Sequence, residues 1–231
     1  MWLDLFLCLL FAHLVSDFVL QTNYTCLNKA KKKWRSLYLY VHTMAVFGLS
    51  WLVVFDIHFW WGALLIGITH LAIDLLKSYC KDNVKWFVVD QIMHFLIIYV
   101  IALTWSKNHM WNIPLNIDRG LIASGIAIII CWKPSNILIK KILKFYRVNM
   151  PDDHADSLNV GALIGTVERW LIIIFVCLKC YEPLGLLIAA KSIIRFGEKE
   201  TAKTEYVLAG TLLSILIAVV VGLLLSNFIE K

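Results

Sequence analysis

Long apolar runs separated by short charged connectors dominate the sequence. A helix rises 1.5 Å per residue, so about 20 apolar residues are enough to cross the hydrocarbon core of a bilayer. Eight such segments are predicted, over residues 1–22, 37–55, 58–77, 86–105, 119–143, 160–181, 183–196 and 205–228. The pattern therefore predicts an all-α, polytopic transmembrane helix bundle of about eight spans, of which the seventh is short.

Polar residues inside these spans recur four positions apart. The three matched pairs are His13 and Asp17, His70 and Asp74, and Asp90 and His94. Residues four apart lie on one face of a helix, and ionisable side chains inside a membrane are costly and usually functional. Together with His42 in the second span, these pairs predict one site built from four helices.

Composition and charge agree with a membrane protein. Apolar residues make up 60% of the chain and charged residues 16%, with a mean hydropathy of +0.75. The connectors after spans one, three, five and seven hold 5, 3, 5 and 4 Lys and Arg residues, or 17 of the 22. The positive-inside rule places these connectors in the cytoplasm and both termini outside it. The net charge of +6 therefore indicates topology and not a nucleic-acid partner.

The predicted orientation places the polar residues of the first four spans at a common depth. Each lies several residues from the cytoplasmic end of its span, or roughly 5–13 Å into the membrane. Imidazole nitrogens and carboxylate oxygens are ligands for Zn²⁺ and related ions. The sequence thus predicts one or two divalent ions, with Zn²⁺ the best match. The candidate ligands are His13, Asp17, His42, His70, Asp74, Asp90 and His94.

A catalytic use of such a site assigns further roles. Asp17, Asp74 and Asp90 are the candidate catalytic carboxylates, and Gln21 and Gln91 are candidate substrate contacts. The alternative is a buried hydrogen-bond network in which the His and Asp side chains pair across helices without a metal.

The second half of the chain carries a different polar set. Glu168, Arg169, Lys191 and Arg195 lie in the cytoplasmic halves of the sixth and seventh spans. One interpretation is an anion pocket that binds a substrate head group. The other is a structural tie between Arg169 and a Glu, with Lys191 and Arg195 reaching toward the membrane surface.

One membrane domain over residues 1–231 is expected, with the His/Asp site in residues 1–105 and the Glu/Arg/Lys set in 119–231. Two patterns of small residues, Gly161 with Gly165 and Gly210 with Ser214, predict close helix contacts and faces for oligomerisation.

Several motifs resemble the bacterial integral-membrane family called domain of unknown function 3307. They include His13-Leu-Val-Ser-Asp17-Phe-x-Leu-Gln21, His70-x-x-x-Asp74 and Asp90-Gln91-x-x-His94. The resemblance implies a bacterial inner-membrane protein with no established activity. More weakly, the His-x-x-x-Asp helices are similar to those of inner-membrane metal-dependent hydrolases.

These features favour an intramembrane metal-dependent hydrolase, open to the cytoplasmic leaflet, whose substrate is an amphiphile with an anionic head group. The alternatives are an ion- or proton-coupled transporter and a non-catalytic scaffold with a structural metal.

Overall fold

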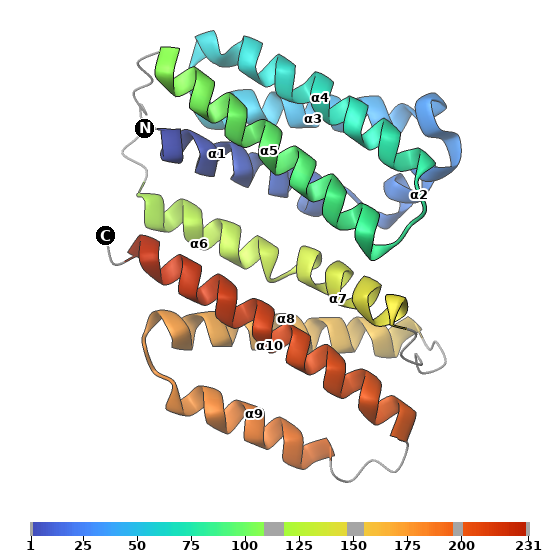
Figure 1. Cartoon of the computed structure of the whole chain (residues 1–231), viewed down its shortest axis with the longest axis vertical. Helices are drawn as coiled ribbons and strands as arrows, with labels where there is room; N and C mark the ends of the chain where they lie inside the picture. The colour runs from blue at the N-terminus through green and yellow to red at the C-terminus, as the bar shows by residue number, and fades with distance from the viewer. Residues whose placement is uncertain (1, 109–117, 147–154, 196–200, 230–231) are drawn as a thin grey trace. The chain divides into compact units, whose positions relative to one another are not determined.

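The computed structural model describes residues 2–108, 118–146, 155–195 and 201–229, and these are helical throughout apart from short turns (Figure 1). The all-α prediction is confirmed. The chain divides into two compact units, residues 1–129 and 130–231. The division falls inside the predicted fifth span and not in the connector after residue 105, so the first unit is larger than the predicted half.

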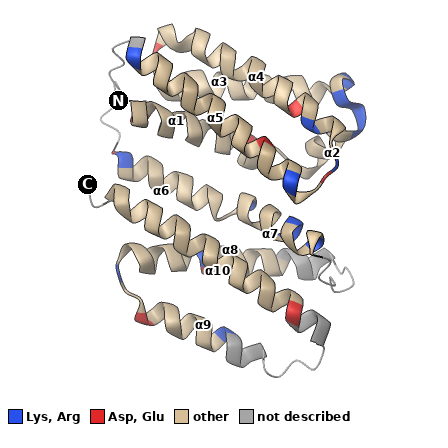
Figure 2. Ribbon diagram, viewed as in Figure 1, with Lys and Arg blue, Asp and Glu red and all other residues tan. Residues whose placement is uncertain are grey.

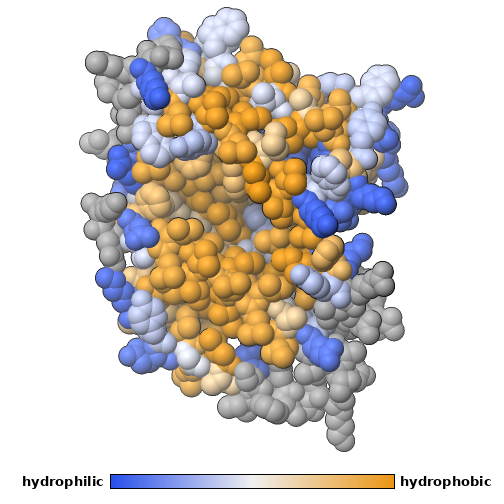
Figure 3. All heavy atoms as spheres, viewed as in Figure 1, coloured by the Kyte–Doolittle hydropathy of each residue, from blue (hydrophilic) through white to orange (hydrophobic). Residues whose placement is uncertain are grey.

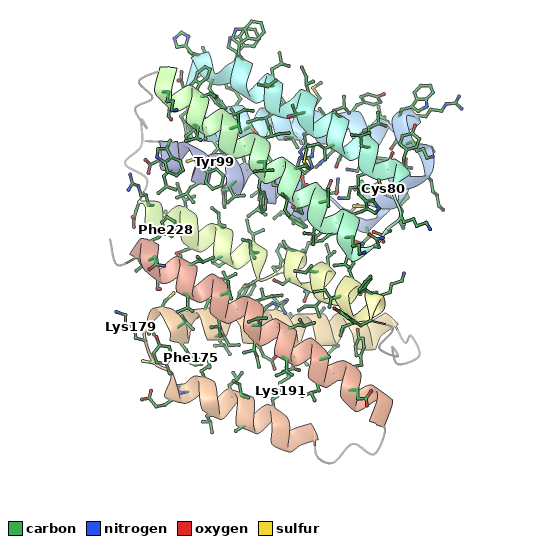
Figure 4. The ribbon with its side chains drawn as sticks, viewed as in Figure 1. Cys80, Tyr99, Phe175, Lys179, Lys191 and Phe228 are labelled. Atoms are coloured by element: carbon green, nitrogen blue, oxygen red, sulfur yellow. The ribbon has the colours of Figure 1, made fainter. Side chains whose placement is uncertain are left out.

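The first unit is a bundle of antiparallel helices. It contains α1 (Trp2–Leu14), which continues as the π-helix η1 (Val15–Leu20), then α3 (Leu37–Val54), α4 (Trp60–Tyr79), α5 (Val84–Asn108) and α6 (Arg119–Ile130). Leu5, Leu9, Val46 and Ala102 belong to its buried apolar core. Tyr99 of α5 lies against α1 in Figure 4, where its ring meets Trp2 and Phe6 edge-on at 5.9 Å.

The predicted connector over residues 23–36 is itself folded. It forms α2 (Asn23–Lys32) and the short 3₁₀ helix η2 (Lys33–Arg35). Thr22 and Thr25 form a reciprocal capping box at the start of α2, which satisfies backbone donors that a helix start otherwise leaves unpaired. Most Lys and Arg residues of the first unit gather at this end of the bundle (Figure 2).

The second unit contains α7 (Lys133–Phe145), α8 (Ala155–Cys177), α9 (Glu182–Arg195) and α10 (Thr201–Ile229). Helices α8 and α10 pack closely at Gly222, where an added Cβ would lie 3.0 Å from Val176. Ile172, Val176 and Ala218 form a buried apolar cluster between them. In Figure 1, successive helices of this unit run in opposite directions.

Seven segments of the described chain are long and apolar enough to cross a membrane. They match seven of the eight predicted spans. The predicted seventh span corresponds to α9, which is not among them. That helix has 14 residues, or about 21 Å against a hydrocarbon core of about 30 Å. The fifth span is broken between α6 and α7, with Pro134 in the first turn of α7, as expected of a residue that cannot donate a backbone hydrogen bond. In each unit, apolar side chains cover the middle of the helices (Figure 3).

Candidate metal centre

The seven predicted ligands of the first unit converge in the bundle interior. They come from α1 and η1 (His13, Asp17), α3 (His42), α4 (His70, Asp74) and α5 (Asp90, His94). None of these side chains is more than 8% exposed. We refer to these seven residues as the His/Asp cluster. The fold thus brings together the seven residues that the sequence predicted to share one site, while their depth in the membrane stays a prediction.

Three of these residues form a compact ligand set, which we call the Asp17 triad. Oδ1 of Asp17 lies 3.3 Å from Nε2 of His42 and 3.4 Å from Nε2 of His70, and the two Nε2 atoms are 3.0 Å apart. Ligand atoms about 2.1 Å from a tetrahedral Zn²⁺ lie about 3.4 Å from one another. The donor types and separations of the triad thus fit a single divalent ion.

Asp74 lies beside the triad and has a counter-ion of its own. Its Oδ2 is 3.7 Å from Nε2 of His42 and 3.9 Å from Nε2 of His70. The ammonium of Lys29, on α2, contacts the same oxygen at 2.5 Å. Asp74 is close enough to act as a fourth ligand or to contact a water beside the triad.

Asp90 and His94 occupy the other side of the cluster. Oδ2 of Asp90 accepts hydrogen bonds from Lys77 at 2.5 Å and from the Gln91 amide at 3.0 Å. Nε2 of His94 lies 3.6 Å from Oδ1 of Asp90, beyond hydrogen-bonding range. The His94 ring stacks on His70 with centroids 4.1 Å apart and lies 5.0 Å from the His13 ring.

The two glutamines predicted as substrate contacts are only partly hydrogen-bonded. Gln21 accepts from the thiol of Cys26 at 3.1 Å, and its Nε2 has no partner among the described residues. Gln91 donates to Asp90, while its Oε1 is likewise unpaired there. Each therefore keeps one buried polar atom available for a ligand.

Two features of the cluster could not be read from the sequence pattern. Lys29 and Lys77 count toward topology in the sequence, but in the fold they are counter-ions of Asp74 and Asp90. The second feature is the π-helix that carries Asp17, a form common at functional sites. Ser16 within it donates to the His13 carbonyl at 2.8 Å and lies 3.3 Å from Oδ1 of Asp17.

The polar residues of the second unit have protein partners. Arg169 is 1% exposed and donates to the Cys131 carbonyl at 2.7 Å, to Asn136 at 2.6 Å and to Ser214 at 2.8 Å. Thr166 is a fourth acceptor, at 3.1 Å. The Arg169 guanidinium thus joins α7, α8 and α10 through neutral acceptors, which is a tie of a different kind from the predicted pairing with a Glu.

Lys191, labelled in Figure 4, forms an ion pair with Glu168 that links α9 to α8. The side chain of Arg195 lies outside the described residues. The role of these residues in anion binding stays a prediction.

The small-residue patterns contribute to packing within the second unit. A Cβ at Gly210 would meet Leu143 of α7 at 3.6 Å, and Ser214 is buried against Arg169. At Gly165 a Cβ would lie 3.2 Å from the Arg169 guanidinium, whereas no described atom lies within 4 Å of such a position at Gly161. The face of Gly210 and Ser214 therefore serves the fold of the chain itself.

Fold and site together define the class: an all-α, polytopic integral membrane protein with a buried His/Asp cluster. Residues 5–118 match the family described as "Protein of unknown function (DUF3307)". Over these residues the chain belongs to that family, and the matched stretch contains the whole His/Asp cluster. No curated protein and no solved structure matches the chain.

Proposed function

We propose that the protein is an intramembrane metal-dependent hydrolase that acts on an amphiphile with an anionic head group. The observation that carries the proposal is the Asp17 triad, whose three ligand atoms lie 3.0–3.4 Å apart. Two His and one carboxylate, with a fourth position left for water, form a common ligand set of catalytic Zn²⁺ sites. An ion held this way lowers the pKa of a bound water and so supplies a nucleophile at neutral pH.

The neighbouring residues have roles that follow from their positions. Asp74 lies beside the triad and is the candidate general base, because its carboxylate faces the ligand nitrogens at 3.7 and 3.9 Å. Lys29 compensates the charge of Asp74 and fixes its orientation through a charge-assisted hydrogen bond. The unpaired amide atoms of Gln21 and Gln91 are candidates for orienting the substrate.

The route of access is inferred from the lysines. Lys77 is 39% exposed along its side chain while its ammonium contacts the buried Asp90. The edge of the cluster where α4 ends and α5 begins is therefore accessible from outside the protein. Lys29 and Lys77 are the cations nearest the site and would attract an anionic head group at this edge.

The proposal also covers the membrane in which the protein lies and its orientation there. We assign the protein to the bacterial inner membrane, with the α2 end of the first unit in the cytoplasm and both termini outside. The support is the distribution of 17 of the 22 Lys and Arg residues over alternate connectors.

The test uses the full chain, purified and reconstituted in vesicles made from a bacterial lipid extract. Mass spectrometry of the lipids should find a cleaved product with the wild-type protein and with Asp82→Asn, a matched change in an exposed turn. Asp17→Asn should lose the product and most of the bound metal. Full turnover and unchanged metal content in Asp17→Asn would exclude the triad as the catalytic site.

A transporter is the second candidate, favoured by one observation. The buried carboxylates Asp74 and Asp90 each pair with a lysine, and such groups exchange protons in ion-coupled transporters. Ion-dependent uptake into the same vesicles, with no lipid product, would support this candidate over the hydrolase.

A further inference from the structure

The unpaired buried atoms of the His/Asp cluster lie on one side of it. Asp17, His42, His70 and Asp74 contact one another, Ser16 or Lys29. By contrast, both ring nitrogens of His13, Oδ1 of Asp90 and Nε2 of His94 have no hydrogen-bond partner among the described residues. Their side chains are among the most buried of the unit, at 2%, 4% and 3% exposure.

Unpaired polar atoms are uncommon in protein interiors because they lose water without gaining a partner. Here four of them occur in three neighbouring residues, which we call the His94 triad (His13, Asp90 and His94). A neutral His13 has one acceptor nitrogen, so three of these atoms can be satisfied by a ligand that accepts electron pairs from imidazole and carboxylate. A divalent cation is such a ligand.

His94 has two partners in the triad at separations that suit a cation. Nε2 of His94 and Oδ1 of Asp90 are 3.6 Å apart, close to the spacing of two ligands on one ion. His94 belongs to two compact groups of ligand atoms, each within 4.8 Å: one with His13 and His70, and one with Asp74 and Asp90. Lys77 and Gln91 bind the other oxygen of Asp90, so Oδ1 is the atom left to face the ion.

We propose that the His94 triad binds a second divalent cation, beside the one assigned to the Asp17 triad. The inference deepens the proposed function and rests on it, because the pair of ions would form one centre. His13 and Asp17 come from one helix, as one residue of each triad. Paired divalent ions are used by hydrolases to bind both the attacking and the leaving oxygen of a substrate.

Lys77 should regulate how tightly the second ion binds. Its ammonium lies 2.5 Å from Oδ2 of Asp90, so it repels a cation held by the other oxygen of the same carboxylate. Removing the charge in Lys77→Gln should tighten binding at the second site by about tenfold, with the repulsion screened by the solvent that reaches this side chain. Lys81→Gln, in the exposed turn nearby, is the matched control.

The experiment is a Co²⁺ titration of the full chain in detergent after removal of metal by a chelator, followed by visible absorption and by metal analysis. Wild-type protein should bind two ions per chain. The control His58→Ala, at an exposed position between α3 and α4, should bind two as well. His94→Ala should bind one. His42→Ala should lose the other ion.

The outcomes separate the two proposals. One ion in both the wild type and His94→Ala, lost in His42→Ala, would overturn the second site and leave the proposed function standing. No bound ion in the wild type would overturn both. If His94→Ala does not fold, the wild-type titration decides: two binding steps, of which Lys77→Gln strengthens one, support the second site, and a single step overturns it.

Discussion

Replacing Arg169 tests whether this residue binds an anion or stabilises the packing of the second unit. The substitution Arg169→Met keeps the length and apolar stem of the side chain and removes its donors. Three acceptors outside α8 then lose their partner: the Cys131 carbonyl, Asn136 and Ser214. We expect the variant to fold less stably and to keep the metal content of the first unit.

The expected loss of stability follows from the number of hydrogen bonds removed. Hydrogen bonds between membrane helices contribute about 0.6 kcal/mol on average and about 1.7 kcal/mol at most, so three of them give about 2–5 kcal/mol. For a chain of this size that corresponds to a decrease in melting temperature of about 4–20 °C. Thermal unfolding in detergent measures it, with Arg35→Met at an exposed position as the matched control.

A double-mutant cycle sharpens the result. The double variant Arg169→Met/Ser214→Ala should lose less stability than the sum of the losses in the two single variants. Both substitutions remove the same 2.8 Å hydrogen bond. An Arg169→Met variant with unchanged melting temperature but weaker binding to anionic vesicles would refute the structural role and favour the anion pocket.

Three further predictions concern other parts of the chain. Glu168→Lys and Lys191→Glu should each lower stability, since either leaves two like charges together, and the double exchange should restore much of it in the same unfolding assay. Cysteines introduced at Lys32 and His58 should react with a membrane-impermeant reagent from opposite sides, Lys32 from the cytoplasm; labelling of both from one side would contradict the topology. His70→Ala should lose most of the metal bound by gently purified protein, because the His70 ring belongs to two of the candidate ligand groups, and elemental analysis against His58→Ala checks this.

The helical fold and the convergence of the cluster were predictable because both follow from periodicity. Apolar runs fix the spans, and a four-residue spacing fixes a shared face of a helix. His42, which has no i, i+4 partner, was assigned to the cluster from its predicted depth alone. It lies 3.0 Å from His70 in the structure.

Other features depend on contacts that have no local signature. Lys29 is 45 positions from Asp74 in sequence, and its role as a counter-ion appears only when α2 folds back over the cluster. The partners of Arg169 are equally remote, in three separate segments. Pairing of Arg169 with a Glu was one of the two interpretations of the sequence, beside an anion pocket. In the structure, several neutral acceptors satisfy the guanidinium instead.

The π-helix at Val15–Leu20 gives the first span one place where its length can change. A π turn holds one residue more than an α turn, so deleting one residue here would let the segment relax into α-helix while the chain on either side keeps its orientation. His13 and Asp17 would stay three or four residues apart and therefore on one face. A one-residue deletion in α1 before His13 has no extra residue to remove. It would rotate Leu5 and Leu9 of the apolar core by about 100° relative to the two ligands.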